Sequence, residues 1–254
     1  MLTVVASGKA APGVSTSAWA LALSWPRPLL LADCDHTGGD LAPGLLAGRV
    51  SVDRGLLSWS AAARRGLPAT AAARLFAEHA AQVPEHPQVS LIPGFTTATQ
   101  GASFTSETWE RLALALGAST ITIGRDVVVD AGRLVTDRGC WPLLRAADQV
   151  LLAVRPSVRS VHAAQDAVQR VRQELGDLAR VAALVIGNGP YRAGEVAKAL
   201  QLPLAGSLPY DWTAAGVLSD GAMSSTKTLR RSALMRAASG LAAELADTAE
   251  AVAG

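Results

Sequence analysis

The amino-acid sequence predicts an α/β fold: a mostly parallel, twisted sheet of seven or eight strands with helices on both faces. Two patterns predict it. Short Val/Leu/Ile runs alternate with alanine-rich stretches along the whole chain. The runs are continuously apolar, which is typical of strands buried on both faces. A length of 254 residues, half of them hydrophobic, suffices for one substantial core. We therefore expect residues 1–254 to form a single domain.

The expected strands are the runs at 2–6, 28–33, 89–93, 126–130, 149–154, 181–187 and 204–207. Apolar side chains recur at three- and four-residue steps between the fifth and sixth runs, and this spacing predicts an amphipathic helix over 157–175. A second helix is expected over 228–250. The segment 36–110 is the least regular, and we expect extra helices and loops there.

The charge and cysteine content exclude several classes of protein. Lys and Arg total 23 and Asp and Glu total 21, so no global charge favours strong DNA binding. Cys34 and Cys140 form no C-x-x-C pair, which argues against a disulfide framework and a metal-cluster carrier. No apolar run approaches the length of a membrane span, and no leader-like segment precedes the first strand. We expect a cytoplasmic protein.

Ligands of open α/β sheets bind at the carboxyl ends of the strands. The first expected strand leads into a turn made of Gly8, Lys9, Ala10, Ala11, Pro12, Gly13, Val14, Ser15 and Thr16. A strand, a Gly/Ser-rich turn and a helix start aim backbone N–H groups at an anion, so this turn is expected to bind phosphate. In the usual G-x-x-x-x-G-K-[ST] loop, lysine contacts the phosphates and the next hydroxyl holds Mg²⁺. Here Val14 replaces the lysine, and Ser15 and Thr16 keep the hydroxyls.

The segment from Lys9 to Thr16 resembles the deviant loop of the MinD/ParA family of P-loop ATPases, K-G-G-x-G-K-[ST]-[ST], and aligns with it without a gap. The first lysine, the glycine and both hydroxyls match, whereas two glycines are alanine and the second lysine is Val14. The resemblance implies a P-loop NTPase fold, ATP or ADP with Mg²⁺ as cofactors, and a homodimer through the nucleotide face. It also implies that Lys9 contacts the nucleotide of the partner subunit. From the residues alone, Lys9 is equally an exposed loop lysine.

Aspartates end two further strands. Asp33 and Asp35 have the family's D-x-D spacing, and the resemblance implies that Asp35 orients or deprotonates the attacking water while Asp33 lies near the metal. Hydrolysis does need a proton acceptor near the γ-phosphate. The alternative is capping of the next helix, which we favour for Asp40. Asp130 ends the fourth expected strand in the Walker-B form, in which an aspartate positions the Mg²⁺ shell.

Other residues near these loops have weaker signals. Gly132 follows the Walker-B strand and is expected to turn a backbone N–H toward a γ-phosphate. We assign no catalytic role to the neighbouring His36 and Arg133. Asn188 resembles the strand-ending asparagine that reads adenine in the family, and a turn residue before Gly-Pro is an equally good interpretation.

The sequence Leu208-Pro209-Tyr210-Asp211 resembles the family's L-P-x-D turn, which packs against the base. Pro209 and Asp211 are therefore expected at the base. A turn in which Asp211 caps the next helix is compatible with the same residues.

Loss of the P-loop lysine removes a charge-assisted contact of about 1.5–3 kcal/mol, or about ten- to a hundredfold in affinity. Turnover should suffer more, because the transition state concentrates the charge. We therefore expect a nucleotide-dependent dimeric localisation or scaffold factor with weak or absent ATP hydrolysis. Its loop resembles those of TadZ/CpaE-like proteins, which position Tad/Flp pili.

Two alternatives stay open: an active ParA-type ATPase that partitions DNA or another cargo, and a metabolic enzyme or metal-cluster carrier on the same fold. The expected partners are a second copy of the chain and an unidentified cargo or secretion machinery. Residues 241–250 carry acids and alanines where membrane-surface helices carry Lys, Arg and bulky apolar residues. We expect no direct membrane anchor, so recruitment to the inner face of the membrane would need a partner.

Overall fold

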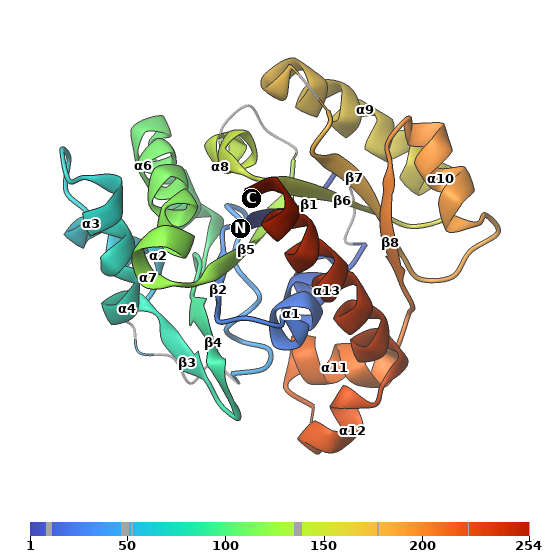
Figure 1. The fold of residues 1–254 in the computed structure, drawn as a ribbon, viewed down its shortest axis with the longest axis horizontal. Helices are drawn as coiled ribbons and strands as arrows, with labels where there is room; N and C mark the ends of the chain where they lie inside the picture. The colour runs from blue at the N-terminus through green and yellow to red at the C-terminus, as the bar shows by residue number, and fades with distance from the viewer. Residues whose placement is uncertain are drawn as a thin grey trace.

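The computed structural model describes residues 1–8, 12–46, 51, 53–134, 139–176, 178–222 and 224–253, with side chains up to residue 248. Within these residues eight strands form one twisted sheet in the order β3-β4-β2-β5-β1-β6-β7-β8 (Figure 1). The strands are β1 (Leu2–Ser7), β2 (Leu29–Asp33), β3 (Ala81–Val83), β4 (His86–Ile92), β5 (Asp126–Arg133), β6 (Gln149–Val154), β7 (Val181–Ile186) and β8 (Leu204–Leu208). β3 runs antiparallel to β4, and the other paired strands are parallel.

The described helices cover both faces of the sheet. They are α1 (Val14–Ser24), α2 (Leu56–Ala62), α3 (Ala69–Arg74), α4 (Phe76–His79), α5 (Ala98–Ala102), α6 (Ser106–Gly117), α7 (Ser119–Ile123), α8 (Trp141–Ala146), α9 (Val158–Leu175), α10 (Ala193–Leu200), α11 (Trp212–Asp220), α12 (Thr226–Arg230) and α13 (Ala233–Ala253). The seven expected strands and the helix over 157–175 are confirmed. The irregular segment 36–110 contains short helices, as expected.

Two features differ from the sequence expectation. The edge strand β3 was not expected, since three residues are too short for a periodic pattern. The helix expected over 228–250 is divided into α12 and α13. The division has a local cause: the Ser232 hydroxyl accepts a hydrogen bond from the Met235 N–H at 3.2 Å, so the chain starts a new helix there.

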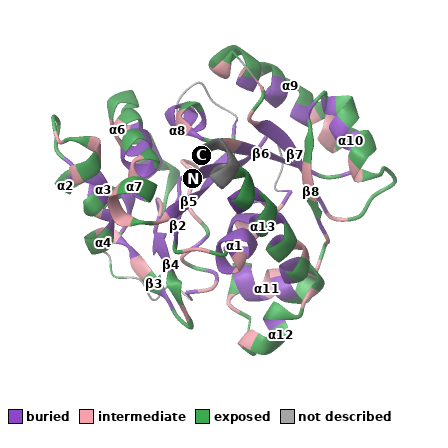
Figure 2. Ribbon diagram, viewed as in Figure 1, coloured by how far each residue is buried: buried purple, intermediate pink, exposed green. Residues whose placement is uncertain are grey.

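Two apolar layers sandwich the sheet. Val4 packs toward α2, α3, α4, α6, α8, α9 and α10, while the next residue, Val5, packs toward α1, α11, α12 and α13. This alternation follows from the two-residue period of a strand. Figure 2 shows the central strands buried and the outer sides of α9 and α10 exposed. Both layers support the sheet edge at which β1, β2 and β5 end.

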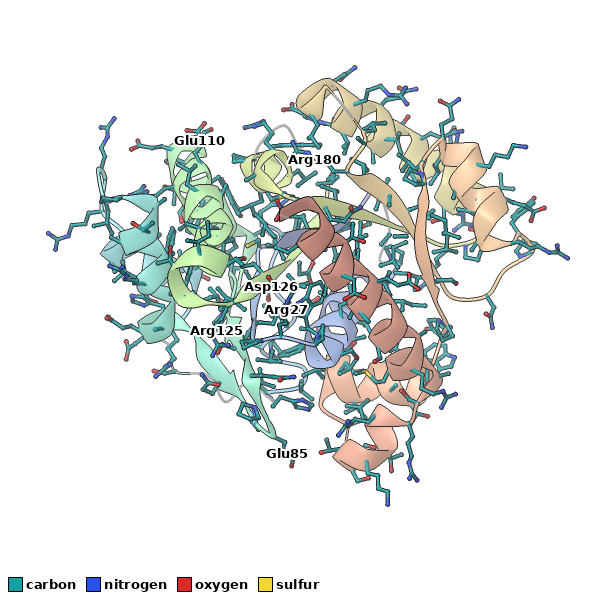
Figure 3. The ribbon with its side chains drawn as sticks, viewed as in Figure 1. Arg27, Glu85, Glu110, Arg125, Asp126 and Arg180 are labelled. Carbon is teal, nitrogen blue, oxygen red and sulfur yellow. The ribbon has the colours of Figure 1, made fainter. Side chains whose placement is uncertain are left out.

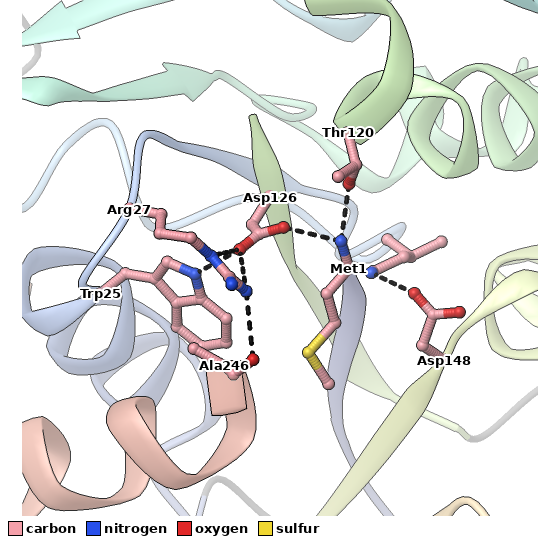
Figure 4. Close-up of polar contacts among 8 residues, drawn as sticks. Met1, Trp25, Arg27, Thr120, Asp126, Asp148 and Ala246 are labelled. Atoms are coloured by element: carbon pink, nitrogen blue, oxygen red, sulfur yellow. Dashed lines mark hydrogen bonds and ion pairs between the residues drawn. The ribbon is translucent and has the colours of Figure 1, made fainter. Parts of the chain in front are cut away.

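A buried charge cluster lies at the opposite edge, where β1 and β5 begin (Figures 3 and 4). Asp126 is 4% exposed. Its carboxylate accepts hydrogen bonds from the Met1 nitrogen at 2.7 Å, the Trp25 indole at 2.9 Å and the Arg27 Nε at 2.8 Å. Arg27 also donates to the Ala246 carbonyl of α13. Burial alone would raise the pKa of Asp126, but these hydrogen bonds and positive charges lower it.

Along the described chain, no helix combines the length and the apolar character that crossing a membrane would require.

Candidate functional site

The turn between β1 and α1 has the backbone of an anion-binding loop. Gly13 has a φ of +110°, in the left-handed region that glycine tolerates best. Its carbonyl accepts the Ser17 N–H at 2.9 Å, which closes the first turn of α1. Among the described residues, no side chain caps α1, so its first N–H groups remain available to an anion. Lys9, Ala10 and Ala11 lie outside the described residues.

The glycine at the start of the loop has a packing role. A Cβ on Gly8 would lie 2.8 Å from the Ala167 Cβ and 2.9 Å from the Ala163 carbonyl oxygen of α9. Glycine therefore lets the loop pass close to α9. Gly8 is not among the residues that line the neighbouring cavity, whereas Ser7 just before it is.

A cavity of about 970 Å³ opens beside this loop. Its walls come from the start of α1, the segment after β2, the end of β5, the turn after β8 and α11. The predicted residues that line it are Pro12, Gly13, Val14, Ser15, Thr16, Asp35, Pro209 and Asp211. This volume suits a cofactor-sized ligand, and the position agrees with the rule for open α/β sheets.

Asp35 projects into the cavity in a fixed orientation. Its Oδ1 accepts hydrogen bonds from the Thr37 N–H at 2.8 Å and the Thr37 hydroxyl at 2.6 Å. Its carboxylate also lies against Gly132, where an added Cβ would be 2.2 Å from the carboxyl carbon. With a φ of +60°, Gly132 adopts a turn that allows this approach. The arrangement can hold a water molecule or proton near the phosphate loop.

Asp33 is not among the residues that line the cavity and is 1% exposed. Cβ atoms on Gly39 or Gly94 would lie within 3 Å of its carboxyl group, so these glycines form a close-fitting cradle. Asp33 Oδ2 accepts the Leu41 N–H at 3.2 Å. Burial raises the pKa of Asp33 well above its usual value, and the nearby Asp130 raises it further.

The cap that we favoured for Asp40 is not formed. The described residues 41–46 after Asp40 are turns and not a helix, so no helix starts there for Asp40 to cap. The Leu41 N–H instead donates to Asp33, as described above. Asp40 is an exposed residue of the cavity wall.

Asp130 is fully buried where β5 pairs with both β1 and β2. Burial raises the pKa of Asp130 to about 6, although the Ser15 side chain and the Gly132 N–H favour its charged form. Its Oδ1 accepts the Gly132 N–H at 2.9 Å, while its Oδ2 has no hydrogen-bond partner in the described part of the chain. A buried oxygen without a partner and the Ser15 hydroxyl at the cavity fit an Mg²⁺ ion with its water shell.

Two aromatic side chains form part of the cavity wall. Tyr210 and Trp212 pack edge to face with ring centroids 4.6 Å apart, and Trp212 is 76% exposed. The Arg155 guanidinium lies 5.8 Å from the Tyr210 ring centroid. Pro209 also lines the cavity, but Asn188 is not among the lining residues. The surfaces here suit a flat ring.

Asp211 has a structural role in addition to its place at the cavity. One of its carboxylate oxygens accepts the Ala214 N–H of α11 at 3.1 Å, and the other accepts the Ala233 N–H of α13 at 3.1 Å. The alternative that Asp211 caps a helix is therefore confirmed.

Sequence reasoning missed part of the lining. It gave no role to Ser7, Arg155, Tyr210 or Trp212, and it left Arg133 without one. The signal available for Arg133 was its position at the end of a strand beside the switch glycine. His36 is not part of the lining, since it packs near Gly101 and Gly139.

Comparisons with solved structures agree with this fold. No protein-family model matches the chain, and no curated protein sequence does. The ParA family ATPase from Chlorobium tepidum TLS superposes with a TM-score of 0.71 at 19% identity over 94% of this chain and 98% of its own. A chain of the MinC:MinD cell division protein complex from Aquifex aeolicus superposes with a TM-score of 0.72 at 16% identity, over 97% of this chain and 96% of its own.

A third similar structure carries a ligand. MinD from Pyrococcus horikoshii OT3, complexed with Mg-ADP, superposes with a TM-score of 0.74 at 15% identity, over 98% of this chain and 96% of that chain. The chain therefore has the fold of MinD/ParA-type ATPases, as the sequence resemblance implied.

Proposed function

We propose that this chain is a MinD/ParA-family protein that binds an Mg²⁺-nucleotide in the cavity and dimerises through that face. The observation that carries the proposal is the junction of β1 and α1. There a left-handed Gly13 and uncapped helix N–H groups adjoin Ser15 and the buried Asp130. A nucleotide-bound structure with the same fold supports the choice of ligand.

The proposed role is that of a localisation or scaffold factor with weak or absent hydrolysis. A bound Mg²⁺ ion would supply positive charge that offsets the charge of the phosphate groups. Ser15 would hold the ion, with Asp130 and Asp33 positioning its water shell. Asp35 would accept the proton of the attacking water. With Val14 in place of lysine, the loop stabilises the transition state poorly, so the chain switches slowly between its nucleotide states.

Titration calorimetry with Mg-ATP, combined with light scattering for mass, tests this proposal directly. We expect binding with a dimer mass, together with little phosphate release. Trp212 provides a second signal, because the other five tryptophans are at most 5% exposed. Nucleotide binding should reduce acrylamide quenching of Trp212. Absence of both binding and shielding at millimolar nucleotide would refute the proposal.

The proposed contact of Lys9 in the partner subunit has its own test. Lys9→Ala should leave the protein monomeric in Mg-ATP. A variant that still dimerises would show that Lys9 is an ordinary loop lysine. A monomeric Lys9→Ala variant would support a contact of Lys9 across the dimer interface, as the resemblance implies.

A second candidate function is an active ATPase that partitions DNA or another cargo. The orientation of Asp35 by Thr37 favours it, because a proton acceptor is already in place. Steady-state phosphate release that Asp35→Ala abolishes would select this function over the first.

The narrower role in positioning Tad/Flp pili is tested by localising a fluorescent fusion relative to the pilus machinery.

A further inference from the structure

We infer that Arg133 supplies the cationic phosphate contact that lysine ordinarily supplies at the position of Val14. The cavity should therefore select ligands that carry a di- or triphosphate group over monophosphates. This inference rests on the proposed function, since it concerns how the same cavity holds its nucleotide.

Few positively charged side chains line the cavity. Among the described residues, the charged side chains of its lining are those of Asp35, Asp40, Arg133, Arg155, Asp211 and Asp220. Carboxylates thus outnumber guanidinium groups, although the caps formed by Asp211 occupy both of its oxygens. A polyphosphate bound here needs cations beyond the helix N–H groups, and the two arginines are the described candidates.

Strand register places Arg133 at the base of the phosphate loop. Arg133 pairs with Ser7, the last residue of β1, and the Leu134 N–H donates to the Ser7 carbonyl at 2.8 Å. From Val5 to Ser7, β1 advances by two residues while β5 advances by three, so β5 carries one extra residue. Bulges of this kind re-aim side chains beside active sites. Gly132 forms the turn with a φ of +60°, and the exposed Arg133 follows it directly.

The other arginine has an aromatic partner in the cavity wall. The Arg155 guanidinium stacks over Tyr210, in the part of the wall that suits a flat ring. Arg133 has no hydrogen bond or ion pair with any residue that the structure describes, and it borders the same space as Gly13 and Ser15. Of the two, Arg133 is therefore the cation available to phosphate.

The chemistry of arginine fits the inferred ligand class. A guanidinium group presents donors in a planar fork and can bind two phosphate oxygens at once. The helix N–H groups already provide one anion site at the start of α1. A second, charged site matters most for a ligand with more than one phosphate group, and adds little for a monophosphate.

The test is titration calorimetry of the whole chain with Mg-ATP, Mg-ADP, AMP and inorganic tripolyphosphate. We expect Arg133→Gln to weaken binding of ATP, ADP and tripolyphosphate at least tenfold while the Kd for AMP changes less than twofold. Arg133→Lys should recover part of the loss. Arg172→Gln on α9 is the matched control, because Arg172 is exposed and does not line the cavity. Thermal unfolding verifies that each variant is folded.

Three results would overturn the inference. The first is a folded Arg133→Gln variant whose affinity for ATP is unchanged. Loss of ATP affinity in Lys9→Gln would then assign the phosphate contact to Lys9. An equal loss for AMP and ATP would show a general or structural effect. If the wild-type chain binds none of the four ligands, the proposed function fails as well. Binding by the wild type with no effect of Arg133→Gln leaves the proposed function intact and removes the inference alone.

Discussion

Val14 carries an aliphatic side chain that is 6% exposed at the start of α1, where a phosphate loop ordinarily has lysine. We expect Val14→Lys to raise the affinity for Mg-ATP about tenfold or more, because it returns a charge-assisted contact. The same change should lower the free energy of unfolding by about 1–3 kcal/mol, because the longer side chain disturbs a packed site. Calorimetry and urea unfolding measure the two effects.

Val14→Met is the matched control for this substitution. Methionine has a similar length without the charge, so it should reproduce part of the stability loss but none of the gain in affinity. A lysine variant that binds no better than the methionine variant would contradict the prediction.

Asp130 illustrates the cost of a buried carboxylate. Burial raises its pKa in the folded state to about 6, above the value of 3.8 for an exposed aspartate. The neutral form is favoured in the fold, so this contribution to stability is present below pH 4 and is lost as the pH rises through about 6. At pH 8 we expect ligand-free Asp130→Asn to be more stable than the wild type by an amount on the order of 1 kcal/mol.

Thermal unfolding between pH 4 and pH 8 measures this difference. The melting temperature of Asp130→Asn should exceed that of the wild type by about 2–4 °C per kcal/mol at pH 8, and the two should converge near pH 4. Mg²⁺-dependent nucleotide binding should be lost in the same variant. A wild type that is the more stable at pH 8 would be inconsistent with a raised pKa.

At the level of elements, Asp211 lines the cavity and caps two helices. It accepts the Ala214 N–H of α11 and the Ala233 N–H of α13, so one side chain caps both. Asp211→Ala should lower the free energy of unfolding by about 2 kcal/mol, roughly twice the usual value for one cap. Chemical denaturation measures the loss.

Ser157→Ala gives a matched single-cap control, since the Ser157 side chain accepts the Ser160 N–H at the start of α9. It should cost about 1 kcal/mol. Equal losses in the two variants would show that the second bond of Asp211, to Ala233, adds nothing to stability.

At the level of the whole molecule, Asp126 joins segments that are far apart in the sequence: the start of β1, the segment after α1, β5 and, through Arg27, α13. Its pKa is lowered in the fold, so it stabilises the folded state above the unfolded pKa, near 4, and loses this effect as the pH falls through the folded value. Asp126→Asn should cost about 2–3 kcal/mol at pH 7.

The cost of Asp126→Asn should shrink as the pH falls below 4, because the wild-type carboxyl then becomes protonated as well. Urea unfolding at pH 7 and pH 3 tests this prediction. A cost that is the same at both values would mean that the charge of Asp126 contributes nothing beyond its hydrogen bonds.

The sequence was a good guide to the sheet because its central strands are buried on both faces. Runs such as 127–129 and 150–154 are continuously apolar, so they are most stable in strands that are covered on both faces. It failed at β3, whose three residues have no periodicity, and at Ser232, whose side-chain hydrogen bond divides α12 from α13. Local hydrogen bonds of this kind leave little trace in a hydrophobic pattern.

For the site, sequence reasoning located what lies along single strands. Asp35 lies just after β2, and Ser15 lies at the start of α1 after the turn that follows β1, so their position in the cavity could be anticipated. The presence of Tyr210 and Trp212 in the cavity wall could not be anticipated, because it depends on the tertiary placement of α11 and of the turn after β8. The same holds for the two caps of Asp211, one of which joins residues 22 positions apart.

The added residue in β5 also affects how related chains should be compared. Consider two related chains, of which only one has this extra residue. Residues at the same distance in sequence from the strand-ending aspartate then face different directions in the two chains, although a sequence alignment gives them the same role. A basic group that compensates for a missing lysine would then go unrecognised in an alignment of sequences. The compensating basic residue is found by a structural comparison. In each related chain, one identifies the residue of the Walker-B strand that pairs with the last residue of the first strand, as Arg133 pairs with Ser7 here.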